Sequence, residues 1–174
     1  YTAAYFWEER NRWFSDLWTD VTGRDQQLSG TEGRNRSGAY PVAIPYRLIN
    51  MFSVYGDTVF DPFWGTGTTT LAAMAAGRSS VGKELDSGFE TEFHETVDGI
   101  EPLTDRLVTD RLSAHETFVE QRRADGESFE YESENYGFPV MTKQEVPIQL
   151  FGIAAVERAD MGYRVRHEPI GPDW

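Results

Sequence analysis

Residues 61–69, with the sequence DPFWGTGTT, decide the fold expected for this chain. An apolar stretch at 58–63 overlaps the start of this run, and an alanine-rich stretch at 71–76 follows it and is closed by Gly77. The apolar stretch predicts a short strand, and the alanine-rich stretch predicts a helix that has Gly77 as its C-cap. The glycines between them predict a tight turn that lets the backbone approach a ligand closely.

A second strand and a second helix are expected directly after this helix. Residues 79–84, with the sequence SSVGKE, are expected to form the second strand. Asp86 or Ser87 is expected to cap a helix that continues to about residue 97. The order of strand, turn, helix and strand is typical of a β-α-β unit, whose hand should be right-handed. We therefore expect an α/β fold.

The residue types around the turn indicate a cofactor that has a ribose but no phosphate. Glu84 lies at the end of the second expected strand, 17 positions after Gly67, where a carboxylate can accept hydrogen bonds from both ribose hydroxyls. No lysine follows Gly67, as a P-loop requires, and Thr70 stands where a dinucleotide-binding turn has a third small residue. Asp61 would repel a pyrophosphate and suits a cationic amino group. S-adenosylmethionine meets these conditions; the alternative is a tight strand–helix turn without a ligand.

Three segments of the chain, in order, resemble motifs of one enzyme family. Residues 61–69 are similar to the cofactor motif of the DNA amino-methyltransferases, which modify cytosine N4 or adenine N6. Residues 36–49 resemble the motif just upstream in the permuted class of that family, and residues 79–86 resemble the motif whose acid holds the ribose. The close match covers about residues 34–90, and residues 13–27 look like the tryptophan-containing region that precedes it.

The resemblance implies a Rossmann-like, S-adenosylmethionine-dependent methyltransferase sheet and a set of cofactor-binding residues. It implies that Asp61 faces the methionine end, that Phe63 lines the pocket and that Glu84 takes the ribose. The full set of expected cofactor-binding residues is Asp61, Pro62, Phe63, Gly65, Gly67, Thr68, Glu84, Ser37 and Ile44. Ser37 and Ile44 are expected to border the methionine end. No metal ligand is expected.

The chain departs from the family in one respect that concerns catalysis. The family carries an Asp/Ser/Asn-Pro-Pro-aromatic loop that grips the target amino group and stacks on the flipped base. No two prolines are adjacent in these 174 residues. In the permuted class that loop precedes the motifs found here, and the chain starts at Tyr1. We therefore expect the C-terminal portion of a longer enzyme, with an incomplete sheet and no catalytic residue of its own; a degenerate or split protein is the alternative.

The expected partner is double-stranded DNA, and the charge distribution limits which part of the chain could contact it. The chain has 16 basic and 29 acidic residues and a net charge of −13, which is unfavourable for binding phosphates. The first fifty residues, however, carry six acids and six arginines, so the candidates for phosphate contact are Arg24, Arg34 and Arg36 in a polar loop at 22–39. An acidic, lysine-poor surface is typical of proteins from high-salt cytoplasm, so a haloarchaeal source is our hypothesis.

Other features of the sequence predict the cellular location of the protein and the target base. The chain has no cysteine and no apolar run of the roughly 18 residues that span a membrane, so we expect a cytoplasmic protein without a membrane partner. Residues 115–145 resemble stand-alone archaeal methylases, which favours cytosine N4 over adenine N6. A restriction enzyme is a candidate partner. The oligomeric state is not predicted.

The chain as a whole, residues 1–174, is expected to form a single α/β domain whose cofactor-binding core is 40–98. Outside the β-α-β unit we expect helices at 5–21, 46–55 and 102–123, an extended segment at 40–45, a strand pair within 129–140 and a last strand at 163–167. Residues 142–145 resemble a capping box.

Two other functions stay open at this stage. The first is a binding module that holds the cofactor or DNA without turnover. The second is a nicotinamide-dependent oxidoreductase that uses Gly65 and Glu84. Competition between S-adenosylhomocysteine and NAD separates the second function from a methyltransferase.

Overall fold

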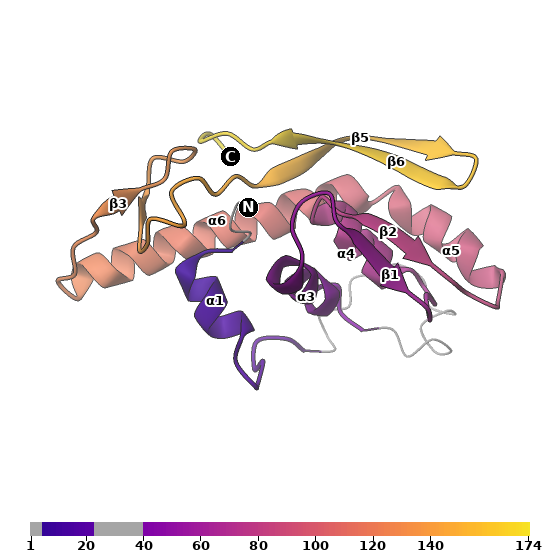
Figure 1. The fold of residues 1–174 in the computed structure, drawn as a ribbon, viewed down its shortest axis with the longest axis horizontal. Helices are drawn as coiled ribbons and strands as arrows, with labels where there is room; N and C mark the ends of the chain where they lie inside the picture. The colour runs from indigo at the N-terminus through magenta and orange to yellow at the C-terminus, as the bar shows by residue number, and fades with distance from the viewer. Residues whose placement is uncertain (1–4, 23–39) are drawn as a thin grey trace. The chain divides into compact units, whose positions relative to one another are not determined.

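The computed structural model describes residues 5–22 and 40–174, and Figure 1 shows how their helices and strands follow one another. The contacts within the chain form two compact units. One consists of Tyr1–Asp16 together with Thr104–Trp174, and the other is Leu17–Leu103. Each unit is described by itself below. The single domain expected over residues 1–174 stays a prediction.

The unit from Leu17 to Leu103 is built on the predicted β-α-β unit. Strand β1 (Thr58–Asp61) pairs in parallel with β2 (Ser79–Gly82), from Thr58 opposite Ser79 to Asp61 opposite Gly82. Helix α4 (Thr68–Ala75) connects them, and α5 (Gly88–Val97) follows β2. The predicted α/β class, the strand–helix–strand order and the small extent of the sheet are confirmed.

Helix α4 forms the core of this unit. Every residue from Leu71 to Ala76 is buried, and the alanines allow α3 (Ala43–Phe52) and the two strands to pack close to the helix. The helix begins at Thr68, three residues earlier than predicted, because Gly67 already serves as its N-cap. The C-cap is Ala76, and Gly77 follows it with a left-handed φ of 70°. The helix therefore ends at Ala75, and its C-cap lies one residue before the predicted one.

The prediction that residues 40–45 are extended is wrong for the last three of them. Helix α3 starts at Ala43 and includes Pro45 as its third residue. The first N–H groups of a helix have no partner within it, so a proline in the first turn removes no hydrogen bond. The helix also ends at Phe52, three residues before the predicted end at Tyr55.

The other unit is organised around α6 (Ile100–Ala124), of which Thr104–Ala124 belong to it. One buried apolar cluster unites side chains of α6 with Phe6 and with the chain from 136 to 150; its members are Phe6, Val108, Leu112, Tyr136, Phe138, Val140, Ile148 and Leu150. Strands β3 (Tyr131–Glu132) and β4 (Pro139–Val140) pair antiparallel, which confirms the predicted strand pair.

The prediction of a helix over residues 5–21 is wrong after Trp13. Helix α1 is Trp7–Trp13 only. Beyond it, Phe14 is 46% exposed and Leu17 is 72% exposed, so a longer helix would bury little apolar surface with these side chains. A helix whose apolar face stays in water gains little from continuing.

The last part of the chain is a long antiparallel ribbon. Strand β5 (Phe151–Ala159) pairs with β6 (Gly162–Pro169), which extends the predicted strand at 163–167 at both ends. Strand β5 itself was not predicted from the sequence. No described helix is long and apolar enough to cross a membrane.

Candidate functional site

The turn between β1 and α4 depends on glycine at two positions. Gly65 and Gly67 have left-handed φ angles of 53° and 75°, and the Gly67 N–H donates to the Trp64 carbonyl over 2.9 Å. A Cβ atom on Gly67 would lie 2.3 Å from Cδ2 of the buried Phe93 ring. Only glycine fits there, so the turn brings backbone N–H groups to the start of α4, where the helix dipole is positive.

Glu84 joins this turn to the end of β2. Its Oε2 atom accepts the Gly65 N–H over 2.8 Å, and its Oε1 atom accepts the N–H groups of Leu85 and Asp86 over 2.8 and 3.0 Å. The hydrogen bonds from the backbone of Asp86, Gly65 and Leu85, in that order, lower the pKa of Glu84. The carboxylate is therefore ionised at neutral pH and ready to accept further hydrogen bonds.

These contacts also limit how many further hydrogen bonds the Glu84 carboxylate can accept. A carboxylate has about four lone-pair positions. Three of them receive backbone N–H groups in this structure. A ligand with two adjacent hydroxyl groups would take the last position and replace one of these N–H donors. The Gly65 contact is the one that joins two separate segments of the chain.

The other predicted residues lie around the same turn. Asp61 is the last residue of β1 and is half-buried; its Oδ1 atom accepts the Phe63 N–H over 3.0 Å. Pro62 is exposed, and Phe63 is 88% exposed. Thr68 is buried, with its hydroxyl 3.2 Å from that of Thr66. The expected role of Phe63 as a pocket wall stays a prediction, because nothing in the described chain covers most of its ring.

The segment expected at the methionine end reaches the same region. The Tyr40 hydroxyl is 2.6 Å from that of Thr69 at the start of α4, and the half-buried Ile44 lies in α3, which packs against α4. Ser37 lies outside the described residues, as do the loop arginines expected to contact DNA, Arg24, Arg34 and Arg36.

Trp64 is the residue of this site that sequence reasoning missed. Its indole N–H donates to the Thr70 hydroxyl over 2.7 Å, and that hydroxyl is 2.9 Å from the hydroxyl of Ser80 on β2. A Cβ atom on Gly82 would lie 2.0 Å from the Trp64 ring, so the ring packs directly on the β2 backbone. Thr70, which departs from the dinucleotide pattern, thus has a structural role as the link between the turn and β2. A large aromatic residue directly before the first glycine was the available signal.

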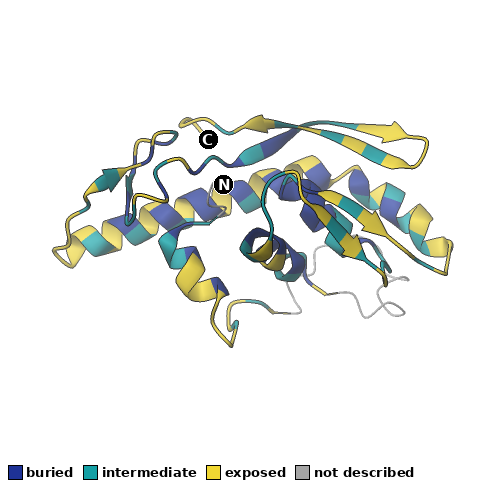
Figure 2. Cartoon of the chain, viewed as in Figure 1, coloured by how far each residue is buried: buried dark blue, intermediate teal, exposed yellow. Residues whose placement is uncertain are grey.

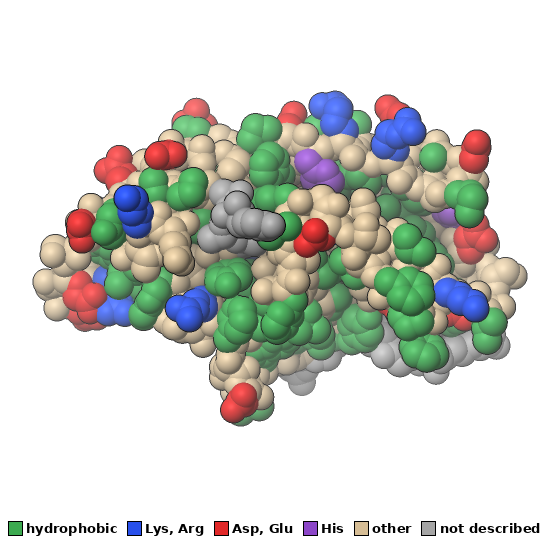
Figure 3. Space-filling view, in the orientation of Figure 1, with side chains coloured by type: hydrophobic (Ala, Val, Ile, Leu, Met, Phe, Trp, Pro, Cys, Tyr) green, Lys and Arg blue, Asp and Glu red, His purple; other side chains and the backbone are tan. Residues whose placement is uncertain are grey.

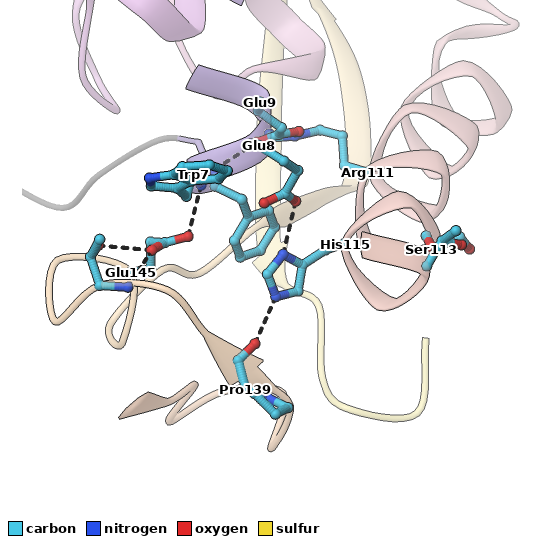
Figure 4. A network of polar contacts seen from close by, with 11 residues as sticks. Trp7, Glu8, Glu9, Arg111, Ser113, His115, Pro139 and Glu145 are labelled. Carbon is cyan, nitrogen blue, oxygen red and sulfur yellow. Dashed lines mark hydrogen bonds and ion pairs between the residues drawn. The ribbon is translucent and has the colours of Figure 1, made fainter. Parts of the chain in front are cut away.

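A second polar network lies in the other unit and is shown in Figure 4. Glu9 accepts two hydrogen bonds from Arg111, over 2.7 and 2.8 Å, with both side chains buried. His115 is fully buried between the Glu8 carboxylate, 2.8 Å from Nδ1, and the Pro139 carbonyl, 2.9 Å from Nε2. The Pro139 oxygen can only accept, so Nε2 carries a proton.

Burial alone would lower the pKa of His115, but its neighbours outweigh burial. The hydrogen bond and the charge of Glu8, the Pro139 carbonyl and the charge of Glu145 together raise the pKa of His115. Glu145 accepts the Trp7 N–H over 2.7 Å and both the N–H and the hydroxyl of Thr142. Of the two capping-box contacts, only the one from the Thr142 N–H to Glu145 is present, since the Glu145 N–H donates to the Thr142 carbonyl, and no helix follows. This network holds α1 on α6 and has a structural role.

Comparison with known proteins assigns the family. The model of the N6_N4_Mtase family, described as DNA methylase, matches residues 2–95, which include the turn, Glu84 and most of α5. The chain belongs to this DNA methylase family. The resemblance to DNA amino-methyltransferases is thereby confirmed, and the haloarchaeal source stays a hypothesis.

Relatives of this DNA methylase chain are longer proteins. It is 47% identical over 149 residues to the type II methyltransferase M.MthZI of Methanothermobacter thermautotrophicus, a match that covers 86% of this chain and 41% of the relative. It is 45% identical over 97 residues to the type II methyltransferase M.MjaI of Methanocaldococcus jannaschii, covering 56% of this chain and 31% of the relative. The chain thus spans less than half the length of these relatives.

A solved structure is also similar. TTHA0409 from Thermus thermophilus, in complex with S-adenosyl-L-methionine, is 34% identical to the DNA methylase chain. The likeness covers 51% of this chain and 30% of that one, with a TM-score of 0.40.

Proposed function

We propose that this chain is the cofactor-binding part of an S-adenosylmethionine-dependent DNA methyltransferase that modifies an exocyclic amino group. The observation that carries the proposal is the ionised Glu84 carboxylate, which contacts the Gly65 N–H where two parallel strands end. Ligands of open α/β sheets bind beyond the carboxyl ends of the strands, and an acid at the second strand is suited to a ribose. Membership of the DNA methylase family supports the reaction class.

The residues of the turn fit this cofactor better than a nucleotide with phosphates. Residues 65–70 contain no basic side chain that would neutralise a phosphate, and Asp61 supplies a carboxylate that suits an ammonium group. We propose that Glu84 accepts the ribose hydroxyls, that Asp61 faces the methionine ammonium, and that Gly67 and Thr68 at the start of α4 approach the cofactor with backbone and hydroxyl groups. When bound, S-adenosylmethionine supplies an electrophilic methyl group.

The rest of the mechanism is positioning. The target amine attacks the methyl group in line, so the protein gains rate by orienting the two reactants and excluding water. The base must leave the duplex to reach the cofactor, and the loop that holds it in this family has two adjacent prolines, which this chain lacks. We therefore propose that catalysis needs a loop from another segment of polypeptide and that the chain alone binds cofactor without turnover.

We further propose cytosine N4 in double-stranded DNA as the target, with adenine N6 as the alternative. The support is the resemblance of residues 115–145 to stand-alone methylases of the cytosine type. A restriction enzyme that cuts at the same site is the proposed companion, since the matched relatives are named type II methyltransferases. Mass spectrometry of nucleosides from DNA treated with the complete enzyme distinguishes N4-methylcytosine from N6-methyladenine.

Cofactor binding by the chain can be tested by thermal unfolding with added ligands. S-adenosylhomocysteine at 100 times its dissociation constant should stabilise the fold by about 2.7 kcal/mol, which raises the melting temperature by several degrees. NAD at the same concentration should leave the melting temperature unchanged. A shift with NAD and none with S-adenosylhomocysteine would replace the methyltransferase by an oxidoreductase.

A further inference from the structure

The ends of β1 and β2 lead into the glycine turn and Glu84, but little of this strand pair is covered. Each strand has four residues, and most positions of β2 are exposed. Phe60 and Val81 are opposite each other in the register and are 63% and 54% exposed. Figure 2 shows exposed positions on both strands beside the largely buried α4, and hydrophobic side chains gather on the surface over the strands in Figure 3. An isolated pair of strands is only marginally stable, so contacts from other residues are needed to fix the distance between the two strand ends.

The backbone of Trp64 makes one of these contacts. Its N–H group donates to the Lys83 carbonyl over 3.1 Å, and the next residue, Gly65, donates to Glu84 over 2.8 Å. The Lys83 N–H donates to the Asp61 carbonyl over 3.0 Å. The hydrogen bonding between the two strands thus continues past their ends as far as the glycine turn.

The side chain of Trp64 contacts the other elements of the site. Its indole N–H donates to the Thr70 hydroxyl over 2.7 Å, and that hydroxyl lies 2.9 Å from the hydroxyl of Ser80 on β2. The ring packs edge-on against the buried Phe93 ring of α5, with 4.6 Å between the ring centroids. It also covers Gly82, where a Cβ atom would lie 2.0 Å from its Cδ1 atom. One side chain therefore connects the turn with α4, β2 and α5.

The contact between Gly65 and Glu84 cannot hold this arrangement alone when a ribose binds. The Glu84 carboxylate accepts three backbone N–H groups, and two ribose hydroxyls need two of its roughly four lone-pair positions. When the hydroxyls replace the Gly65 N–H, the contacts of Trp64 still join the turn to β2, because none of them involves the Glu84 carboxylate.

We propose that Trp64 is a positioning residue for cofactor binding, which fixes the distance between the glycine turn and Glu84 so that both reach the cofactor at once. This inference rests on the proposed function, which assigns Glu84 to the ribose of S-adenosylmethionine. A site that is already ordered binds its ligand more tightly, because less conformational freedom is lost on binding. A turn released from β2 would have to be ordered each time the cofactor binds, which lowers the affinity.

The test is titration calorimetry of S-adenosylhomocysteine with the variants Trp64→Phe and Thr70→Val. Trp64→Phe keeps an aromatic ring next to Gly82 and loses the N–H donor, whereas Thr70→Val removes the acceptor of the same hydrogen bond. Each variant should bind about fivefold more weakly than the wild type. The double variant should lose less than about twofold more than either single variant, since all three lack the same hydrogen bond. Wild-type affinity in both folded single variants would overturn the inference.

A double-mutant cycle with Glu84→Gln separates positioning from general destabilisation. Because Trp64 acts through the placement of Glu84, Trp64→Phe should weaken binding by less than about twofold in the Glu84→Gln background. The full loss of about fivefold in that background would show that Trp64 acts independently of Glu84, and the positioning role would be wrong. The control is Trp7→Phe, which removes an indole that stacks on Phe118 in the other unit and should leave the affinity unchanged.

The same titrations separate the inference from the proposed function. If the wild type binds S-adenosylhomocysteine and only Glu84→Gln weakens binding, the proposed function stands and the inference about Trp64 is wrong. If the wild type does not bind, the proposed function fails and the inference fails with it. Melting temperatures of all variants are measured first. If Trp64→Phe does not fold, Thr70→Val decides, because it leaves the Trp64 ring in place.

Discussion

Replacing Gly67 by alanine tests how closely the turn packs against α5. Gly67 has a φ of 75°, and forcing an L-residue into this region costs about 1–2 kcal/mol. The added Cβ would lie 2.3 and 2.7 Å from two atoms of the Phe93 ring and 3.0 Å from the Trp64 ring. Phe93 is 4% exposed, so it cannot swing into solvent, and overpacking a core typically costs about 1–3 kcal/mol. Together, these two costs should lower the free energy of unfolding by about 2–5 kcal/mol.

Urea unfolding followed by tryptophan fluorescence measures this loss, with the slope m unchanged between variants. Gly56→Ala is the matched control, because Gly56 has a similar φ of 83° but no atom within 4 Å of an added Cβ. Gly56→Ala should lower the free energy of unfolding only by the cost of placing an L-residue at positive φ, about 1–2 kcal/mol. Gly65→Ala, whose added Cβ would meet only the Phe63 carbonyl at 3.9 Å, should resemble Gly56→Ala. Equal losses at Gly67 and Gly56 would refute the close approach of Phe93.

Two predictions concern the network that holds α1. Glu9→Gln should destabilise the fold by about 3–5 kcal/mol in denaturant titrations, because the buried Arg111 guanidinium would lose the neighbouring negative charge of Glu9. A loss below about 1 kcal/mol would contradict a buried ion pair. The pKa of His115 is raised in the fold, so its protonated form, paired with Glu8, stabilises the fold. This stabilisation is fully present below the pKa of the unfolded chain, about 6.5. It is lost as the pH rises through the higher pKa of the folded chain. As the pH rises, the free energy of unfolding should therefore fall more in the wild type than in His115→Gln. The control His94→Gln should behave like the wild type. Parallel pH profiles for all three proteins would count against the pairing of protonated His115 with Glu8.

The sequence was most informative where local chemistry decides the structure. The two glycines of the turn and the apolar runs at 58–63 and 71–76 are enough to predict β1 and α4, since each element is bounded by residues that end it. Strand β2 was expected after Gly77, although Val81 is its only large apolar residue. Glu84 was expected as the last residue of the second strand; it lies two residues beyond the observed end of β2 at Gly82. Its contact with the Gly65 N–H could not be foreseen, because it depends on how two strand ends lie side by side.

Features that depend on distant partners were missed or misjudged. Nothing local in Trp64 shows that its indole would bond Thr70 and cover Gly82 on the neighbouring strand. The apolar period of residues 5–21 predicts the helix correctly up to Trp13 and fails beyond it, where Phe14 and Leu17 are exposed. Strand β5 is apolar only in its first half, and its pairing with β6 determines its length.

The affinity of S-adenosylhomocysteine for Glu84→Gln, measured by titration calorimetry, tests the central claim most directly. The amide keeps the size of the side chain but removes the charge that attracts the ribose hydroxyls, so binding should weaken about tenfold or more relative to the wild type. Glu95→Gln, an exposed position on α5, is the control and should leave the affinity unchanged. Wild-type affinity in Glu84→Gln, with both proteins folded, would contradict the assignment of Glu84 to the cofactor.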